Sequence, residues 1–378
     1  MEEIGVGIVG FGFMGRAHTF GYKTIPLYYK DLPYKIRLVG VADTNLEAAE
    51  RAKEQLGFEM ATADPEELFS RDDIQCIDVC TPNLYHKAGI LGALAHGKNV
   101  YCDKPLAACY AETPEILEAA KKAGSTTQMA MNSRQYPGML RTKELIDEGR
   151  LGRILSFRIQ YLHSGSVDPN KPIGWKQDKK MGGGGVLFDL GSHVLDLLYF
   201  FMGRFDSVNA TTMVAYPQRP DGTGRMVDIE ADDAAYLTVK MANGALGTVE
   251  ATKIATGSND EIRFEIHGVK GAVAYNSMQP NFLRFYDNTL PDAPLGGDKG
   301  FTAIETVHRY HAPGGGFPGP KFGVGFLRGH VHSLYTYLDN VYHHRPGTPS
   351  FEDGAYIQYV MEEAYRSAEE KAWVNLKG

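Results

Sequence analysis

The first third of the chain alternates short apolar runs with stretches whose apolar residues recur at helical spacing. The apolar runs, which we predict to be buried strands, are Ile4–Val9, Arg37–Val41, Cys76–Cys80, Asn99–Cys102 and Thr126–Ala130. The helical stretches between them are Asn45–Leu56, Pro65–Phe69, Leu84–His96 and Pro114–Ala123. This alternation predicts an α/β domain with a doubly wound parallel sheet over residues 1–130, because crossover helices cover both faces of such a sheet.

Beyond residue 130 the apolar runs follow one another with few helical stretches between them. The predicted strands are Ile154–His163, Ser207–Tyr216, Ala234–Met241, Ala245–Ala255, Glu261–Gly268 and Ala272–Asn276. Turn signals at 242–244 and 269–271 predict antiparallel hairpins. Helical stretches are Phe188–Met202, Phe326–His344 and Asp353–Ala372. We assign residues 131–378 to an α+β domain with a large, mainly antiparallel open sheet, and expect the helix at 353–372 to pack back towards the first domain.

Composition and charge exclude several classes of protein. The 378 residues carry 39 Lys and Arg against 46 Asp and Glu, a net charge of −7, which argues against nucleic acid or an anionic membrane as the main partner. Four cysteines without a C-x-x-C pair argue against a disulfide framework or a zinc ribbon. The most apolar stretches, Ile4–Met14 and Val194–Met202, are too short to span a bilayer. We therefore expect a cytoplasmic protein.

A glycine-rich motif follows the first predicted strand and opens a helix. Its residues are Gly10, Phe11, Gly12, Phe13, Met14 and Gly15, which form a G-x-G-x-x-G pattern. In this setting the glycines allow a tight turn and close approach to a dinucleotide pyrophosphate. Asp43, at the end of the second strand, can accept hydrogen bonds from ribose hydroxyls and favours NAD over NADP. Asp43 lies further along the chain than is usual, and we interpret Ile25–Pro33 as an insertion.

Three further motifs resemble those of the Gfo/Idh/MocA oxidoreductases. The first is Thr81, Pro82, Asn83 and His86 after a strand, the second is Asp103-Lys104-Pro105, and the third is the G-G-G-x-x-x-D-x-G-x-H run from Gly183 to His193. The resemblance extends from Gly7 to the segment Pro349–Gly354, nearly the whole chain. It implies an NAD-dependent oxidoreductase with a Rossmann domain and a second domain for substrate binding and oligomerisation.

The resemblance makes Lys104, Asp189 and His193 the catalytic trio. The spacing agrees, because Asp189 and His193 are four residues apart on a predicted helix and share a face, which Asp196 extends. Oxidation of an alcohol needs a base for the hydroxyl proton, and histidine, with an ordinary pKa near 6.5, suits that role. Lys104 can polarise the developing alkoxide or act as the base itself, and the sequence leaves both assignments open.

The resemblance also implies cofactor and substrate contacts outside the trio. This sequence departs from the usual family motifs at two places. Asp103 stands where Glu is usual, and Met131–Arg134 stands where many members have F-N-Y-R. The implied cofactor contacts outside the glycine-rich motif and Asp43 are Thr81, Pro82, Asn83, His86, Asp103, Lys104, Asn132, Trp175 and Lys176. Expected substrate contacts are Lys104, Tyr161, His163, Trp175, Asp189, His193 and His332. We expect no metal, because His330 and His332 diverge on a helix and no Glu or Cys ligands accompany them.

Within the family, Gly12–His18, Phe264–Gly268 and Tyr161–Trp175 look most like the levoglucosan dehydrogenase and glycoside 3-dehydrogenase branch. We therefore predict oxidation of a pyranose hydroxyl, at C3, of a sugar or glycoside. The alternatives are an inositol dehydrogenase, a cofactor-binding protein without catalysis, and an enzyme that recycles a tightly held NAD.

We also predict a homo-oligomer, a dimer or a tetramer. The predicted strand Ser207–Tyr216 places Val208, Ala210, Thr212 and Val214 on one weakly polar face. Such a face is a plausible subunit interface.

Overall fold

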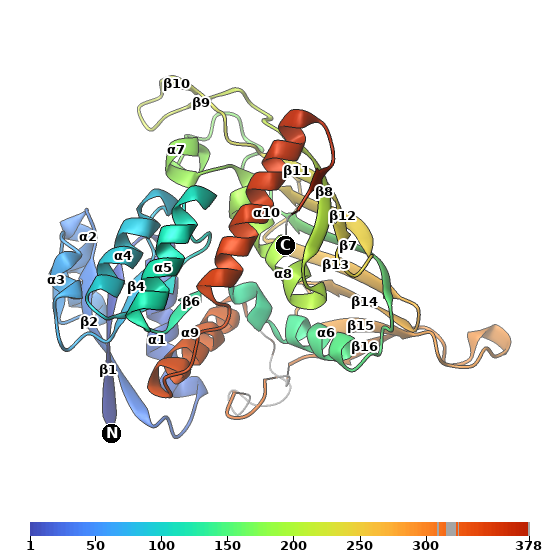
Figure 1. Ribbon diagram of the computed structural model, residues 1–378, viewed down its shortest axis with the longest axis horizontal. Helices are drawn as coiled ribbons and strands as arrows, with labels where there is room; N and C mark the ends of the chain where they lie inside the picture. The colour runs from blue at the N-terminus through green and yellow to red at the C-terminus, as the bar shows by residue number, and fades with distance from the viewer. Residues whose placement is uncertain (308–309, 315–322, 324, 377–378) are drawn as a thin grey trace.

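The computed structural model describes residues 1–307, 310–314, 323 and 325–376, and it is built around two β-sheets (Figure 1). The first sheet has six parallel strands in the order β3-β2-β1-β4-β5-β6. Their bounds are β1 Glu2–Val9, β2 Tyr34–Ala42, β3 Met60–Thr62, β4 Cys76–Val79, β5 Asn99–Cys102 and β6 Thr127–Met129. The predicted doubly wound sheet is confirmed, with β3 as a short strand that the sequence pattern did not reveal.

Helices cover both faces of the first sheet. They are α1 Phe13–Tyr28, α2 Leu46–Leu56, α3 Glu66–Phe69, α4 His86–Ala95 and α5 Thr113–Ala123. A later helix, α9 (Phe326–Tyr342), packs along α1, where Cα of Val331 lies 3.9 Å from a Cβ built on Gly21. The chain beyond residue 131 therefore contributes to the layers around the first sheet.

The predicted insertion Ile25–Pro33 is divided between a helix and a connection. Its first four residues belong to α1, which contains Pro26 and ends at Tyr28, and β2 begins at Tyr34. The long spacing between Gly15 and Asp43 is thus filled by the end of the first helix and the connection that follows it. Proline is usually disfavoured inside a helix, and α1 accommodates it at Pro26.

The second sheet has nine strands in the order β16-β15-β14-β13-β7-β12-β11-β8-β17. Neighbouring strands are antiparallel except for β7 and β12, which run parallel. The turns at 242–244 and 269–271 make the predicted hairpins. The bounds are β7 Ile154–Leu162, β8 Phe205–Met213, β11 Ala234–Met241, β12 Leu246–Thr252, β13 Glu261–Gly268, β14 Gly271–Asn276, β15 Phe282–Asp287, β16 Phe301–Glu305 and β17 Val374–Asn375. A separate two-stranded sheet pairs β9 (Gln218–Pro220) with β10 (Met226–Asp228).

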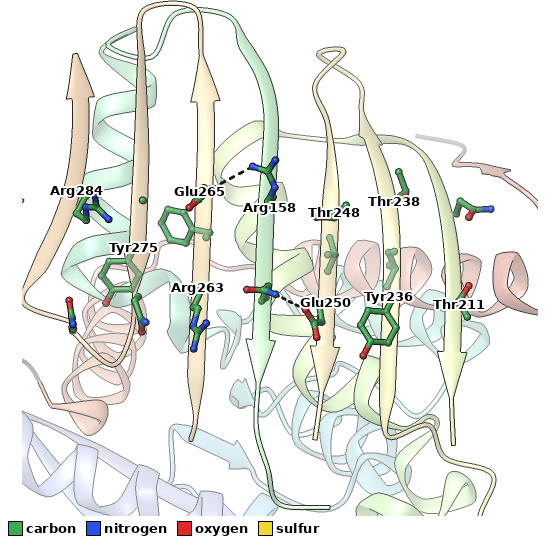
Figure 2. A pocket seen from close by; sticks show the side chains of 18 of the residues that line it. Arg158, Thr211, Tyr236, Thr238, Thr248, Glu250, Arg263, Glu265, Tyr275 and Arg284 are labelled. Carbon is green, nitrogen blue, oxygen red and sulfur yellow. Dashed lines mark hydrogen bonds and ion pairs between the residues drawn. The ribbon is translucent and has the colours of Figure 1, made fainter. Parts of the chain in front are cut away.

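One face of the second sheet is covered by α6 (Pro137–Asp147), α8 (Ser192–Met202) and α10 (Phe351–Glu370) (Figure 1). Val208 and Ala210 of β8 are buried on this face, and the amide of Ala210 donates to Ser367 Oγ of α10 at 3.0 Å. Our prediction that these two residues form an exposed interface was therefore wrong. The opposite face carries polar and aromatic side chains and lies open (Figure 2).

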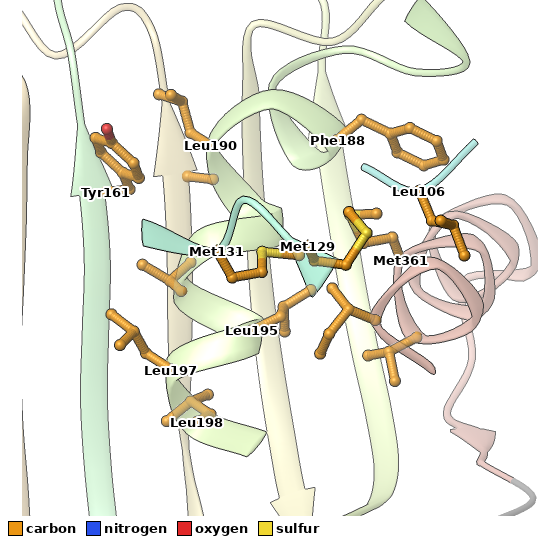
Figure 3. Packing of buried hydrophobic residues seen from close by; sticks show 14 of the residues in the cluster. Leu106, Met129, Met131, Tyr161, Phe188, Leu190, Leu195, Leu197, Leu198 and Met361 are labelled. Atoms are coloured by element: carbon orange, nitrogen blue, oxygen red, sulfur yellow. The ribbon is translucent and has the colours of Figure 1, made fainter. Parts of the chain in front are cut away.

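The two sheets share a continuous hydrophobic core. Met129 and Met131, at the end of the first sheet, gather with Leu195 of α8 and Met361 of α10 (Figure 3). Helix α10 also contacts β6 and α5, as we expected for the C-terminal helix. The segment Lys179–Met202 is long and apolar enough to cross a membrane, but 83% of its most apolar window is buried inside the fold. That burial is the usual state of a core helix.

Candidate active site

The glycine-rich loop between β1 and α1 has the backbone geometry that a dinucleotide requires. Gly10 has a φ of +93°, and a Cβ there would lie 2.8 Å from the backbone of Cys80 and Thr81. A Cβ at Gly15 would lie 2.3 Å from the carbonyl oxygen of Gly10, so only glycine allows this packing. A Cβ at Gly12, in contrast, would meet nothing within 4 Å. The open space at Gly12, beside the N-terminus of α1, fits a pyrophosphate.

Asp43 lies beside this loop at the end of β2. Its Oδ2 accepts a hydrogen bond from the amide of Phe11 at 2.7 Å, and its Oδ1 accepts one from the amide of Asn45 at 2.8 Å. Phe11 is buried, Met14 is half-buried, and Phe13 is exposed. The carboxylate is thus held where the adenosine ribose of a bound dinucleotide is expected.

The loops after β4 and β5 are locked to each other and to the second domain. The His86 ring nitrogens lie 2.8 Å from the carbonyl oxygens of Thr81 and Pro105. Both nitrogens are therefore used within the protein, and His86 can act on a cofactor only through the loops that it joins. The Asn83 amide donates to the carbonyl of Gly182 at 2.8 Å. Other predicted cofactor contacts at this edge are Pro82 and Asp103, both half-buried, and Asn132, which is buried.

Asp189 lies at the centre of an ion-pair cluster with three lysines from separate segments. Lys104 Nζ is 3.0 Å from Asp189 Oδ1 and donates to the Asp189 carbonyl oxygen at 2.5 Å. Lys176 Nζ is 2.6 Å from Oδ1, and Lys253 Nζ is 2.9 Å from Oδ2. Burial raises the pKa of Asp189, but the three lysines outweigh it and hold that pKa well below its ordinary value. We call these four residues the lysine cluster.

Glycines before Asp189 allow the backbone to reach this place. A Cβ at Gly183, where φ is +78°, would lie 2.0 Å from the carbonyl oxygen of Ala108. A Cβ at Gly185 would lie 2.2 Å from the amide nitrogen of Asp232, whose carboxylate accepts from the Gly185 amide at 3.1 Å. A π-helical turn, Leu187–Gly191, then leads into α8. Such turns recur at functional sites, and this one carries Asp189.

His193 completes the predicted trio from the first turn of α8. Its Nδ1 lies 3.1 Å from Ser133 Oγ, and its ring meets the Tyr161 ring edge-on with centroids 5.6 Å apart. Burial and the charge of Lys104 hold the pKa of His193 well below 6.5, although Asp189 opposes them. The imidazole is therefore neutral near pH 7, and the bond to Ser133 leaves Nε2 for another partner.

Asp196, which extends the helical face of Asp189 and His193, has a different partner. It is fully buried, and Arg134 binds it through two hydrogen bonds of 2.6 and 2.8 Å. Arg134 also lies 3.4 Å from Asp353 at the start of α10. A buried guanidinium requires a carboxylate partner, and Asp196 serves as the partner of Arg134 although it shares a helical face with Asp189 and His193. The pair instead joins the turn Asn132–Gln135 to α8 and α10.

Of the other predicted substrate contacts, Tyr161 lies near the end of β7, and His163 and Trp175 lie beyond it. The Tyr161 hydroxyl donates to Asp260 Oδ1 at 2.7 Å, and His163 Nδ1 accepts from a backbone amide two residues further on. Trp175 is 38% exposed, and Lys176 Nζ lies 5.7 Å from its ring centroid. Tyr161 is thus brought to His193, and Trp175 to the lysine cluster.

His332 lies elsewhere, in an aromatic cluster between α1 and α9. Its Nδ1 lies 2.6 Å from the Tyr29 hydroxyl, and its ring is 4.4 Å from Tyr310 and 6.0 Å from Tyr335, centroid to centroid. Burial and the neighbouring Arg328 lower the pKa of His332 to about 3. We therefore correct the prediction of a substrate contact. The sequence showed a histidine near the start of a helix, but the packing of α9 on α1 decides its surroundings.

One group of potential metal ligands occurs among the described residues, formed by His18, Asp78 and Cys80. His18 Nδ1 is 3.0 Å from Asp78 Oδ2, and the Tyr22 hydroxyl donates to the same oxygen at 3.0 Å. Burial lowers the pKa of His18, but Asp78 outweighs it and raises that pKa above its ordinary value. The hydrogen bonds that Asp78 accepts from His18 and Tyr22 make these residues a buried hydrogen-bond network.

Our sequence reasoning missed Lys253, Asp260 and Ser133. Lys253 directly follows β12, which pairs in parallel with β7 so that Thr252 lies opposite Leu162. The ends of these two strands therefore meet at one edge of the sheet. Knowledge of this parallel pair would have pointed to Lys253, but the hairpin pattern predicted only antiparallel neighbours.

Comparisons with known proteins agree with this geometry. Residues 4–131 match the model for the oxidoreductase family with an NAD-binding Rossmann fold, and residues 139–274 match the GFO/IDH/MocA C-terminal domain. Levoglucosan dehydrogenase of Pseudarthrobacter phenanthrenivorans is 32% identical, with 100% of this chain and 99% of that protein covered. Myo-inositol 2-dehydrogenase of Thermotoga maritima is 25% identical over 98% of both chains.

A solved structure of levoglucosan dehydrogenase in complex with NADH has a TM-score of 0.95 to this chain, with 32% identity and complete coverage of both chains. The glycine loop, the conserved order of the two domains and the full-length match together identify the fold and the cofactor. The chain belongs to the Gfo/Idh/MocA family and is an NAD-binding oxidoreductase similar to levoglucosan dehydrogenase.

Proposed function

We propose that the protein oxidises a ring hydroxyl, at C3, of a glucose-like pyranose or glycoside and passes the hydride to NAD. The observation that carries this proposal is the lysine cluster around Asp189, with His193 beside Lys104. The full-length similarity to levoglucosan dehydrogenase supports a sugar as substrate. Solved structures of that enzyme hold NADH with levoglucosan or with L-sorbose.

The cofactor side of the proposal rests on the loop geometry. Bound NAD⁺ supplies the acceptor for the hydrogen and the two electrons that leave the C–H bond of the alcohol. The space at Gly12 and the N-terminus of α1 bind the pyrophosphate, and Asp43 accepts hydrogen bonds from the ribose hydroxyls. The same carboxylate repels the 2′-phosphate of NADP, so we propose NAD as the cofactor in use.

The proposed roles of His193 and Lys104 follow from their charges. Neutral His193 takes the hydroxyl proton at Nε2 while the C–H bond breaks, so the alcohol becomes a ketone. Lys104 donates a hydrogen bond to the reacting oxygen and stabilises the negative charge that develops on it. Asp189 holds the Lys104 ammonium between its carbonyl and carboxylate oxygens. We assign Tyr161, His163 and Trp175 to the substrate side of the pocket.

An inositol dehydrogenase is the second candidate. The full-length match to myo-inositol 2-dehydrogenase favours it, and a cyclic polyol can use the same base and cation. A cofactor-binding protein without catalysis is less well supported, because Lys104 and Asp189 are paired and His193 is neutral beside them.

The test is NADH formation with a panel of pyranoses, glycosides and inositols. We expect the wild type to oxidise pyranoses or glycosides fastest, and expect Lys104→Ala and His193→Ala to lose nearly all activity. The exposed residues Lys121 and His343 supply matched control variants, Lys121→Ala and His343→Ala. Equal rates in the wild type and in both site variants would sink the assignment, and faster oxidation of inositols would favour the second candidate.

The same purified protein tests whether NAD is recycled. Tightly held NAD that passes hydride from a donor sugar to a keto-sugar would remain bound through purification and support turnover without added cofactor. Turnover that depends fully on added NAD would exclude recycling.

We further propose a homo-oligomer that uses the open face of the second sheet, in place of the face that we first predicted. Tyr236 and Phe282 are 46% and 45% exposed on this face, and Arg158 pairs with Glu265 at 3.5 Å (Figure 2). A second copy of the chain can cover it across a two-fold axis. We expect a dimer or a tetramer by light scattering, and dissociation in Tyr236→Asp; a monomeric wild type would refute the proposal.

We propose the cytoplasm as the location, since all four cysteines are free.

A further inference from the structure

The two oxygens of the Asp189 carboxylate have unequal surroundings. Oδ1 is shared by Lys104 and Lys176, at 3.0 and 2.6 Å. Lys253 Nζ lies 2.9 Å from Oδ2, on the other oxygen of the carboxylate. Lys253 therefore opposes rotation of the carboxylate away from Lys104.

Lys253 is built into the fold more firmly than Lys176. Its side chain is 12% exposed, whereas that of Lys176 is 46% exposed. The Lys253 amide donates to the Asp233 carbonyl, and its own carbonyl accepts from the Ser166 amide, both at 2.9 Å. With its backbone held on two sides at the end of β12, the Lys253 ammonium is a fixed charge, while Lys176 lies in a short exposed turn.

Lys104 faces a conflict that this arrangement resolves. In the proposed reaction Lys104 must interact with the substrate oxygen, yet it is also an ion-pair partner of buried Asp189. A buried carboxylate that loses a cation is destabilised strongly. Lys253, a second fixed cation at Oδ2, keeps Asp189 charged and oriented. Lys104 can then donate one of its hydrogen bonds to the substrate oxygen.

We propose that Lys253 is a positioning residue: it fixes the Asp189 carboxylate through Oδ2 and thereby holds Lys104 at the site of oxidation. This role rests on the proposed oxidation of a hydroxyl at the same site. Lys253 itself takes no proton and touches no reacting atom in this account.

The test compares Lys253→Met with Lys253→Arg in steady-state assays of sugar oxidation with NAD⁺, and measures NADH binding separately. We expect Lys253→Met to lower kcat about 10- to 100-fold, because Asp189 and Lys104 can then shift away from the reacting geometry. The KM for the sugar and the Kd for NADH should stay within about threefold, a change of under about 0.7 kcal/mol. Lys253→Arg should recover most of the lost kcat because it restores the cation. Lys240→Met, at an exposed position on β11, is the control.

Two results would overturn the inference. One is a raised KM with kcat unchanged, which would make Lys253 a substrate ligand. The other is a crystal structure of the NADH complex of Lys253→Met in which Asp189 and Lys104 keep their contact. That structure needs no substrate, so it tests the inference even if no carbohydrate is oxidised and the proposed function fails. A rotated Asp189 and a lost Lys104 contact there would support the inference on its own.

Discussion

The cofactor end and the proposed substrate end of the site each contain one aspartate, and different interactions hold the two aspartates in place. Asp43, at the cofactor end, is held by two backbone amides beside a glycine loop. Asp189, at the substrate end, is held by lysines from three distant segments. A backbone-built site depends on local sequence, whereas a site built from side chains depends on how the two sheets meet. The first end can therefore be recognised from a short motif, and the second needs the tertiary structure.

Loss of the Asp189 charge should have the largest effect. Asp189→Asn leaves three lysines without their anion, so we expect kcat to fall about 10²- to 10⁴-fold and the free energy of unfolding to fall by about 3–5 kcal/mol. Steady-state kinetics and urea unfolding measure the two quantities. The matched change at the other end, Asp43→Asn, should weaken NADH binding and leave stability nearly unchanged. Similar losses of stability in both variants would contradict the contrast.

The second largest effect on stability should come from the buried ion pair of Arg134 with Asp196, which joins the turn Asn132–Gln135 to α8. Arg134→Met leaves fully buried Asp196 without its partner, and we expect the free energy of unfolding to fall by about 3–5 kcal/mol in denaturant titrations. Adding Asp196→Leu should recover most of this loss, since the buried charge is then gone. Surface ion pairs contribute up to about 1 kcal/mol to the free energy of unfolding. A loss below that value in Arg134→Met would therefore show that this buried pair does not stabilise the contact of the turn with α8.

The glycine loop allows a sharper comparison within the cofactor end. Gly12→Ala places its Cβ in open space, so we expect unchanged stability but NADH affinity weakened about tenfold, or about 1.4 kcal/mol. Gly15→Ala places its Cβ 2.3 Å from a carbonyl oxygen, and we expect a loss of stability of about 1–3 kcal/mol. Calorimetry with NADH and thermal unfolding distinguish them. An unchanged NADH affinity in Gly12→Ala would place the cofactor elsewhere.

The smallest effect is a pH dependence at the substrate end. Burial and Lys104 lower the pKa of His193, with smaller contributions from His330 and Lys176, and Asp189 opposes them. The neutral form is the active base, so kcat/KM for oxidation should stay constant as the pH falls to 6.5. It should decrease only below that, as His193 takes up a proton. An acidic limb with a midpoint at or above 6.5 would contradict the proposed state of His193.

The sequence predicted most of the first domain because its signals are local. Buried parallel strands are apolar throughout, and the glycine motif requires no knowledge of distant residues. The trio Lys104, Asp189 and His193 was predicted from motifs along the chain, and the structure places Lys104 and Asp189 in contact. His332 was misread because the packing of α9 on α1 decides the surroundings of its side chain.

Two of the three missed residues share one cause. Lys253 and Asp260 reach the site through the parallel pairing of β7 with β12 and the antiparallel pairing of β7 with β13, which join strands far apart in sequence. The role of Asp196 could not be read from helical spacing, which shows the face that a residue shares but not what that face contacts. In the structure Asp196 binds the buried Arg134.

The central claim is that the hydrogen on C3 of a pyranose leaves as a hydride beside His193 and Lys104. It is tested most directly with a glucoside that carries deuterium at C3 only, incubated with the wild-type enzyme and NAD⁺. The account predicts that the deuterium appears on the nicotinamide ring of NADH and that the product is a 3-keto sugar by NMR. NADH without deuterium, formed from the same glucoside, would contradict the account.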